Sequence, residues 1–363
     1  MKITIVAGAR PNFMKIAPII HAIISAQKKG EDIQYRLIHT GQHYDKKMSD
    51  DFFEQLEIPQ PDANLQAAGG SQAEQTAAIM IRFEQELMDN PSNLVLVVGD
   101  VTSTMACAIT AQKLGVKVAH VEAGIRSGDW SMPEEINRLV TDSITNYFFT
   151  TSEIANENLI KNGVDDKNIF FVGNTMIDTL LKQMPRFVKP DFWDRIPLVN
   201  AQYFVMTLHR PANVDQESKL KDLIDKIILA SNGLPIIFPV HPRTAKMLKN
   251  IGISAPNLHM VEPLSYLEFN YLVKHAKAVV TDSGGITEEA SIMGIPCMTL
   301  RDNTERPETI TLGTNELIGT KPEAIPPAFE KLFDGKWKKG SRIPMWDGNT
   351  AERIVDAILK FSL

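Results

Sequence analysis

Short runs of apolar residues alternate along this chain with longer segments in which apolar residues recur at helical spacing. Short runs bounded by polar turns are typical of strands, and the amphipathic segments between them are typical of helices. The predicted strands occupy residues 3–6, 34–39, 94–98, 117–121, 147–150 and 169–172 in the first half, and 203–207, 235–239, 258–261, 278–281 and 296–300 in the second. Because strands that alternate with helices form parallel sheets covered on both faces, the pattern predicts two doubly wound, Rossmann-like α/β domains.

The predicted domain boundary lies in residues 184–202, which are rich in proline, aromatic and charged residues and lack a clear period. Such segments are typical of connections between domains. We therefore predict an N-terminal domain over residues 1–183 and a C-terminal domain over residues 184–349. The last stretch, 350–363, is amphipathic and follows a turn-forming Asp-Gly-Asn sequence, so we expect a closing helix that packs back on the N-terminal domain.

Composition narrows the class of protein. With 363 residues the chain exceeds the usual size of a single core, which favours two domains. The formal charge of −6 and the lack of a basic stripe argue against a nucleic-acid surface. Cys107 and Cys297 lie in buried-looking segments, which favours reduced thiols over a disulfide framework. No signal-peptide pattern and no membrane-spanning apolar run is found, so we expect a cytoplasmic protein.

Acidic residues follow two neighbouring predicted strands and begin the next helix. Asp100 follows strand 94–98, Glu122 follows strand 117–121, and Glu134 lies in the segment that opens the following helix. In parallel α/β sheets, ligands bind beyond the carboxyl ends of the strands. Converging carboxylates raise one another's pKa, so an acid and a base can coexist near neutral pH. Each residue alone also fits a cap, a turn or a salt bridge, but the three together predict an acid–base group.

Basic residues and histidines occupy the same predicted edges. Arg10 and Lys15 follow the first strand, and His209 and His241 follow two strands of the second half. The basic pair could lie over a pyrophosphate or be solvated at a helix entrance, and the histidines also fit core or turn positions. The first strand is followed by Gly-Ala-Arg-Pro instead of G-x-G-x-x-G, which argues against a nicotinamide cofactor. No H-E-x-x-H or paired C-x-x-C occurs, so we expect no metal and no cofactor.

The sharpest phosphate-binding candidate is the strand-to-helix junction over residues 281–289. Its glycines, Gly284 and Gly285, allow close approach of the backbone, and the N–H groups at a helix start suit a diphosphate. Ser283 lies in the same turn. Glu289, one turn into the helix, could accept hydrogen bonds from both ribose hydroxyls. The alternative is an ordinary glycine turn in which Asp282 or Ser283 is an N-cap.

Taken in order, these motifs resemble one family, the non-hydrolysing UDP-N-acetylglucosamine 2-epimerases. The resemblance spans Arg10 to Gly313 and is carried by Gly8-Ala9-Arg10-Pro11, Lys15, Val98-Gly99-Asp100, His120-Val121-Glu122-Ala123-Gly124-Ile125-Arg126, Pro133-Glu134-Glu135-Ile136-Asn137-Arg138, Gly173-Asn174-Thr175, His209-Arg210, Thr281-Asp282-Ser283-Gly284-Gly285 and Glu305-Arg306-Pro307-Glu308. It implies a GT-B-type pair of domains facing across a cleft that closes on a UDP-sugar.

The resemblance implies an isomerase that interconverts UDP-N-acetylglucosamine and UDP-N-acetylmannosamine. UDP would be eliminated to leave a 2-acetamidoglucal and then re-added on the inverted C2. The implied acid–base residues are Asp100, Glu122 and Glu134, with individual roles unassigned. Lys15, Arg10 and His209 would stabilise the departing diphosphate. The implied nucleotide-binding residues are His241, Ser283, Gly284, Gly285 and Glu289, with Arg138 near the substrate and Arg306 a weaker candidate. The resemblance also implies a homodimer and a place in cell-surface polysaccharide biosynthesis.

One departure from the family pattern concerns regulation. Bacterial members often bind a second UDP-sugar as an activator through an arginine-bearing turn and a Gln-His loop. Gln42 and His43 are present here, but residues 67–72 lack the arginine, which puts allosteric activation in doubt.

Several other functions stay open on the sequence. The departure leaves room for a related substrate such as a UDP-diacetamido-uronic acid. A hydrolysing 2-epimerase, a GT-B glycosyltransferase and a catalytically silent nucleotide-sugar sensor are the remaining alternatives.

Overall fold

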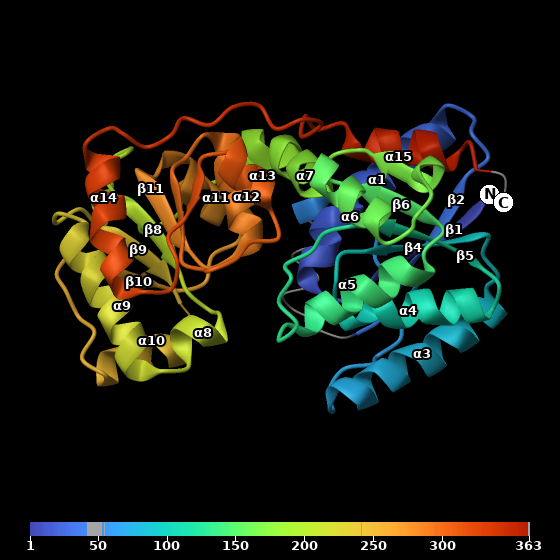
Figure 1. Ribbon diagram of the computed structural model, residues 1–363, viewed down its shortest axis with the longest axis horizontal. Coiled ribbons are helices and arrows are strands. Elements are labelled where there is room, and N and C mark those ends of the chain that lie inside the picture. The colour runs from blue at the N-terminus through green and yellow to red at the C-terminus, as the bar shows by residue number, and fades with distance from the viewer. Residues whose placement is uncertain (42–52, 54, 241, 362–363) are drawn as a thin grey trace. The chain divides into compact units, whose positions relative to one another are not determined.

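A computed structural model describes residues 1–41, 53, 55–240 and 242–361 (Figure 1). The chain divides into two compact units. Unit 1 contains Met1–Thr179 together with Pro344–Leu363, and unit 2 contains Leu180–Ile343. Unit 1 is therefore built from two separate stretches of sequence.

Unit 1 has a seven-stranded parallel sheet with the order β3-β2-β1-β4-β5-β6-β7. Its strands are β1 (Lys2–Ala7), β2 (Gln34–His39), β3 (Ala63–Asn64), β4 (Leu94–Val98), β5 (Lys117–Val121), β6 (Tyr147–Thr150) and β7 (Ile169–Phe171). Its helices include α1 (Arg10–Lys28), α3 (Gln72–Asp89), α4 (Thr102–Lys113), α5 (Pro133–Ile144), α6 (Glu153–Lys161), the start of α7 (Thr175–Gln183), α15 (Thr350–Ile358) and the short η1 (Asp166–Asn168). The strand order reverses between β1 and β4, so the loops after these strands open a crevice suited to a ligand.

Unit 2 repeats the arrangement with six parallel strands in the order β10-β9-β8-β11-β12-β13. Its strands are β8 (Phe204–Thr207), β9 (Ile236–Pro239), β10 (Leu258–Val261), β11 (Ala278–Thr281), β12 (Cys297–Thr299) and β13 (Asn315–Leu317). Its helices are η2 (Met184–Arg186), α8 (Pro211–Val214), α9 (Glu217–Ala230), α10 (Pro242–Asn250), α11 (Tyr266–His275), α12 (Gly284–Met293), α13 (Pro307–Thr311), η3 (Pro322–Ala324) and α14 (Ile325–Phe333). The order reverses between β8 and β11. The two doubly wound α/β sheets predicted from the sequence are confirmed.

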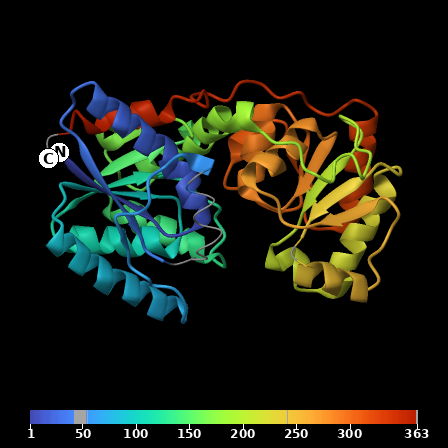
Figure 2. The same ribbon diagram turned by 180° about the vertical axis from the view of Figure 1, so that it is seen from behind.

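Both sheets are covered on both faces. In unit 1, α3, α4 and α5 lie together on one face, and α1 and α15 pack against each other on the other (Figures 1 and 2). All five residues of β4 are buried, as expected for a central strand between two helical layers. In unit 2, Phe204 packs in the cluster that includes α9 and α14, whereas Val205 packs in the cluster that includes α11. Successive side chains of a strand point to opposite faces, so both faces of this sheet carry a core.

The chain returns to unit 1 through α15. The Ala351 N–H at the start of this helix donates a hydrogen bond of 2.7 Å to the Asp178 carboxylate on α7. Burial raises the pKa of Asp178 to about 6, although the hydrogen bonds that it accepts work in the opposite direction. Thr179 beside it donates to the Met14 carbonyl of α1 at 2.6 Å. These bonds join α7, where the chain leaves unit 1, to α1 and to α15, where the chain returns to unit 1.

Candidate functional site

Asp100 and Glu122 leave adjacent strands of unit 1 at the same level. Val98 of β4 pairs with Val121 of β5, and the Gly99 N–H donates to the Val121 carbonyl at 3.0 Å. Glu122 follows Val121 directly, and Asp100 follows Val98 after one intervening residue, Gly99. The sheet register therefore brings both carboxylates to the carboxyl edge next to the reversal of strand order.

Glu122 is buried against a lysine. Its carboxylate, with 4% of the side chain exposed, lies 2.8 Å from the Lys15 Nζ of α1. The backbone of Glu122 has a φ of +71°, which is uncommon for a residue with a side chain. The N–H groups of Glu122 and Ala123 both donate to the Phe149 carbonyl of β6, which holds this conformation in place. Strained backbone of this kind, worth roughly 1–3 kcal/mol, is often found at functional sites.

The side chains of α5 hold Asp100 and the loop before the helix. Arg138 donates to the Asp100 carboxylate at 2.6 and 3.1 Å, and Asn137 donates to the Asp100 carbonyl at 2.8 Å. Glu135 accepts hydrogen bonds from Arg138 and from the backbone N–H groups of residues 127 and 128. Burial alone would raise the pKa of Glu135, but these hydrogen bonds lower it below its ordinary value. Glu134 is half-buried in the first turn of the same helix, so α5 carries one of the predicted carboxylates and holds a second, Asp100.

The loop after β1 is fixed by Asn12 of α1. Its Oδ1 accepts the N–H groups of Gly8 and Ala9, and its amide nitrogen donates to the Val98 carbonyl. Gly8 is required here because a Cβ at this position would lie 2.1 Å from the Ser103 hydroxyl. The loop and the end of β4 are thereby joined, and Lys15 extends from the second turn of α1 toward Glu122.

Four predicted residues cannot be placed by their side chains. Arg10 is the first residue of α1, but its side chain lies outside the described part of the structure. Gln42, His43 and His241 also lie outside the described residues. Their predicted roles stay predictions.

In unit 2, His209 is held by a buried aspartate. The Asp282 carboxylate lies 2.9 Å from the His209 Nδ1 and also accepts the backbone N–H groups of His209 and Arg210. Asp282 is fully buried, whereas 63% of the His209 side chain is exposed. Burial works to raise the pKa of Asp282, but the hydrogen bonds and the charge of His209 bring it below its ordinary value. The imidazole is therefore orientated by a carboxylate, and most of the ring is exposed.

The predicted phosphate cradle lies at the start of α12. Ser283 is the N-cap residue, yet its side chain makes no capping hydrogen bond, so the first-turn N–H groups lack a side-chain cap. A Cβ built on Gly285 meets no atom within 4 Å, and one built on Gly284 meets atoms only at 3.8 Å. The fold itself does not require glycine at these positions. Open space over uncapped N–H groups is what a bound phosphate needs.

Glu289 is buried one turn further along α12. It accepts a hydrogen bond of 2.7 Å from the Tyr266 hydroxyl of α11. Burial raises the pKa of Glu289 from 4.5 to about 7; the Tyr266 and Asn270 hydrogen bonds lower it, and the charge of Glu288 raises it further. The Tyr266 hydroxyl therefore holds the Glu289 carboxyl group in place on the helix that begins at the predicted cradle.

We expect Glu289→Gln to make unit 2 more stable at alkaline pH. Because the pKa of Glu289 is higher in the folded protein, the fold favours the protonated form, and the stability gained below pH 4.5 is lost as the pH rises through about 7. At about 1.4 kcal/mol for each pH unit between the two values, the loss is on the order of 3 kcal/mol. Urea unfolding between about pH 5 and 8 measures it. The exposed Glu323→Gln is the matched control, and parallel curves for both variants and the unchanged protein would contradict this expectation.

Arg306 is buried against the acidic residues of unit 2. Its Nε contacts the Glu288 carboxylate. Arg301 forms a two-armed ion pair with Glu305 at 2.7 and 2.8 Å, and Arg210 lies 3.7 Å from the same carboxylate. These ion pairs surround the start of α12. Arg306 thus lies beside the predicted cradle and is paired with Glu288 of the same helix, α12.

The sequence patterns missed the residues that orientate the predicted ones. Glu135 contacts Arg138, Asp282 contacts His209, and Tyr266 contacts Glu289. The last two contacts join residues that are far apart in the sequence, and Glu135 directly follows the predicted residue Glu134. Asp282 lies within the Thr281-Asp282-Ser283-Gly284-Gly285 motif, which is the signal that could have identified it. Tyr266 carried no signal, because only the packing of α11 on α12 brings it to Glu289.

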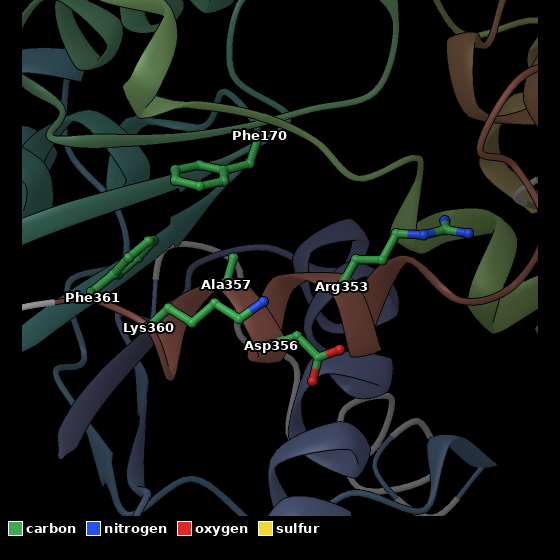
Figure 3. Close-up of a pocket in the computed structure, with 6 residues that line it drawn as sticks. All are labelled: Phe170, Arg353, Asp356, Ala357, Lys360 and Phe361. Atoms are coloured by element: carbon green, nitrogen blue, oxygen red, sulfur yellow. The ribbon is translucent and has the colours of Figure 1, made fainter.

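Other parts of the described chain offer no competing centre. Among the described residues, no group of three His, Cys, Asp or Glu side chains could hold a metal ion, and no helix is long and apolar enough to cross a membrane. A pocket of about 430 Å³ lies between β7 and α15 (Figure 3). Its lining residues are Phe170, Arg353, Asp356, Ala357, Lys360 and Phe361. Arg353 is already bonded to Asp347 and to two backbone carbonyls, and none of the predicted site residues lines this pocket.

Known proteins match this chain over nearly its full length. The sequence profile of the family described as UDP-N-acetylglucosamine 2-epimerase covers residues 25–359. The UDP-N-acetylglucosamine 2-epimerase of Methanocaldococcus jannaschii is 41% identical, and the match covers 98% of both chains. The UDP-2,3-diacetamido-2,3-dideoxy-D-glucuronate 2-epimerase of Pseudomonas aeruginosa is 38% identical over 90% of both chains.

Solved structures give the same result. The crystal structure of the M. jannaschii enzyme in complex with UDP-GlcNAc and UDP superposes with a TM-score of 0.87 and covers 99% of both chains. A glycosyltransferase of kitacinnamycin, at 11% identity, superposes with a TM-score of 0.57 over 98% of both chains and shows a shared fold alone. The GT-B-like class predicted for the two sheets is confirmed.

Proposed function

This chain belongs to the UDP-N-acetylglucosamine 2-epimerase family, and we propose on that basis that it interconverts UDP-N-acetylglucosamine and UDP-N-acetylmannosamine. It is an isomerase of nucleotide sugars. The observation that carries the assignment is the full-length match to the family together with the position of Asp100 and Glu122 just beyond the ends of the adjacent strands β4 and β5, where Lys15 contacts Glu122.

Unit 1 would supply the acid–base chemistry. The C2 proton of the sugar is weakly acidic and becomes easier to remove as the C1–O bond breaks and positive charge develops on the ring. One carboxylate of the set Asp100, Glu122 and Glu134 would take this proton, and another would return a proton to the opposite face. Such assistance is worth about 10²–10⁴-fold in rate. Lys15, which lies 2.8 Å from Glu122, would stabilise the negative charge of the leaving diphosphate, with Arg10.

Unit 2 would hold the nucleotide. The uncapped N–H groups at Ser283, Gly284 and Gly285 would bind the diphosphate, and Glu289 would bind the ribose hydroxyls. His209, orientated by Asp282, would donate a hydrogen bond to a phosphate oxygen. His241, Arg138 and Arg306 complete the proposed binding set. No metal or cofactor is needed for this elimination and re-addition.

Incubation with UDP-N-acetylglucosamine in heavy water, followed by NMR, tests the function. Because C2 is deprotonated and then reprotonated from solvent, we expect deuterium at C2 of a UDP-linked epimer. Free N-acetylmannosamine together with released UDP would indicate a hydrolysing epimerase instead. Intact, undeuterated substrate would remove this substrate assignment, and UDP binding without turnover would favour a sensor.

A related substrate is the second candidate. The P. aeruginosa relative carries a name that specifies a diacetamido-glucuronate, and its identity to this chain, 38%, is close to that of the M. jannaschii epimerase. The same heavy-water assay with the UDP-diacetamido-uronic acid compares the two sugars directly. The substrate with the higher kcat/KM is the better transition-state ligand.

We also propose a homodimer in a reducing, cytoplasmic compartment. Ile81 and Met88 lie two turns apart on α3 with 68% and 54% of their side chains exposed, and this apolar stripe offers a surface for a second copy.

Cys107 and Cys297 are both buried free thiols, which suits a reducing compartment. Sedimentation equilibrium gives the mass that tests the dimer.

A further inference from the structure

A buried histidine lies beneath the two acid–base loops of unit 1. His120 is on β5, two residues before Glu122, and 1% of its surface is exposed. Its Nε2 lies 2.8 Å from the Gly99 carbonyl oxygen, and its Nδ1 lies 2.7 Å from Asp142 Oδ1. Both ring nitrogens are thus within hydrogen-bond distance of an oxygen, and neither is in contact with the proposed substrate groups.

The partners of His120 determine where its protons are. A backbone carbonyl can only accept, so Nε2 must carry a proton. Asp142 is a carboxylate: its Oδ2 lies 2.6 Å from the Arg126 guanidinium and accepts the Gly124 N–H at 3.1 Å. Burial works to raise the pKa of Asp142, but the hydrogen bond and charge of His120 and the charge of Arg126 lower it below its ordinary value. An ionised carboxylate also only accepts, so Nδ1 carries a proton as well.

The same pair joins the two loops that carry Asp100 and Glu122. Through Nε2, His120 holds the carbonyl of Gly99, a residue with a φ of +69° that directly precedes Asp100. Through Asp142 it reaches the Gly124 N–H in the loop that follows Glu122. Asp142 lies on α5, the helix that also carries Glu134 and binds Asp100 through Arg138.

We propose that His120 is a positioning residue for the reaction: as an imidazolium paired with Asp142, it holds the Gly99–Asp100 turn and the Glu122–Arg126 loop at a fixed separation. The charged groups around it are Asp142 of α5, Arg126 beside that carboxylate, Glu122 two residues along the chain, and Lys15 of α1, which contacts Glu122. The strained backbone of Glu122 needs such support, because a φ of +71° persists only where the surroundings fix it. The positioning role rests on the proposed epimerase activity, whereas the protonation state does not.

NMR of the full chain labelled with ¹⁵N-histidine tests the protonation state independently of activity. The chain contains eight histidines, and the signal of His120 is the one that His120→Gln removes. We expect signals of two protonated ring nitrogens, because each nitrogen faces an oxygen that only accepts a hydrogen bond. Asp142→Asn should convert the ring to a neutral tautomer. A ring with one unprotonated nitrogen in the unchanged protein would overturn the proposal whether or not the proposed substrate is turned over.

Kinetics test the positioning role. We expect Asp142→Asn and His120→Gln to lower kcat for C2 exchange by about 10- to 100-fold, the cost of a small displacement of reacting groups, with KM and UDP affinity little changed. His259→Gln on β10 is the matched control and should leave kcat unchanged. Normal kcat in a folded Asp142→Asn variant, or an equal loss of kcat and UDP binding, would overturn the positioning role.

Discussion

Asp100→Asn is expected to abolish most C2 exchange while leaving UDP binding intact. The amide has nearly the shape of the carboxylate and can still accept the hydrogen bonds from Arg138, so the turn after β4 should keep its conformation. It cannot take up or return a proton in the reaction. The expected loss of kcat is about 10²–10⁴-fold, the usual worth of one acid–base group. The rate of deuterium incorporation at C2 measures it.

The matched control is Asp165→Asn. Asp165 is an exposed residue of the same unit that caps η1, and it is far from the ends of β4 and β5 in the sequence. The Asp165→Asn variant should therefore show unchanged C2 exchange. Calorimetric titration with UDP shows whether the nucleotide still binds to the Asp100 variant. Exchange within about tenfold of the unchanged protein would refute Asp100 as an essential acid–base group, since tenfold corresponds to only 1.4 kcal/mol.

The fold was predictable because its signal is repeated along the chain. Each core strand is a short apolar run that both helical layers bury, and β4 shows this pattern at all five positions. The strands that the sequence did not reveal, β3 and β13, are edge strands of two and three residues. Edge strands of this length bury little apolar surface, so their sequences need not carry the pattern. The predicted strand 296–300 is also shorter in the structure, where β12 spans Cys297–Thr299.

The sequence predicts the strand-end residues of the candidate site and not the groups that orientate them. Parallel sheets bring residues after neighbouring strands to one edge, which is why Asp100 and Glu122 could be paired from the sequence. The contact of Lys15 with Glu122 depends on the approach of α1 to β5, a distance of 107 positions along the chain. The support of His209 by Asp282 likewise spans 73 positions. No local pattern encodes such contacts, because they are set by how helices and loops pack on the sheet.

Gly285→Asp is expected to abolish UDP binding without unfolding unit 2. A Cβ at this position meets no atom within 4 Å, and the residue lies in the first turn of α12, where an acidic side chain interacts favourably with the helix dipole, so stability should be kept or raised. The carboxylate of the new aspartate would occupy the space proposed for the diphosphate and would repel its negative charge. We expect UDP affinity to fall by at least about 100-fold, or 2.7 kcal/mol. Gly285→Ala is the matched neutral variant, because its methyl group adds bulk without charge. It should lower UDP affinity by about tenfold. It should also add up to about 1 kcal/mol to the free energy of unfolding, since alanine is the better helix former. Calorimetric titration with UDP and urea unfolding separate the two effects. Normal UDP affinity in a folded Gly285→Asp protein would place the diphosphate somewhere other than the start of α12.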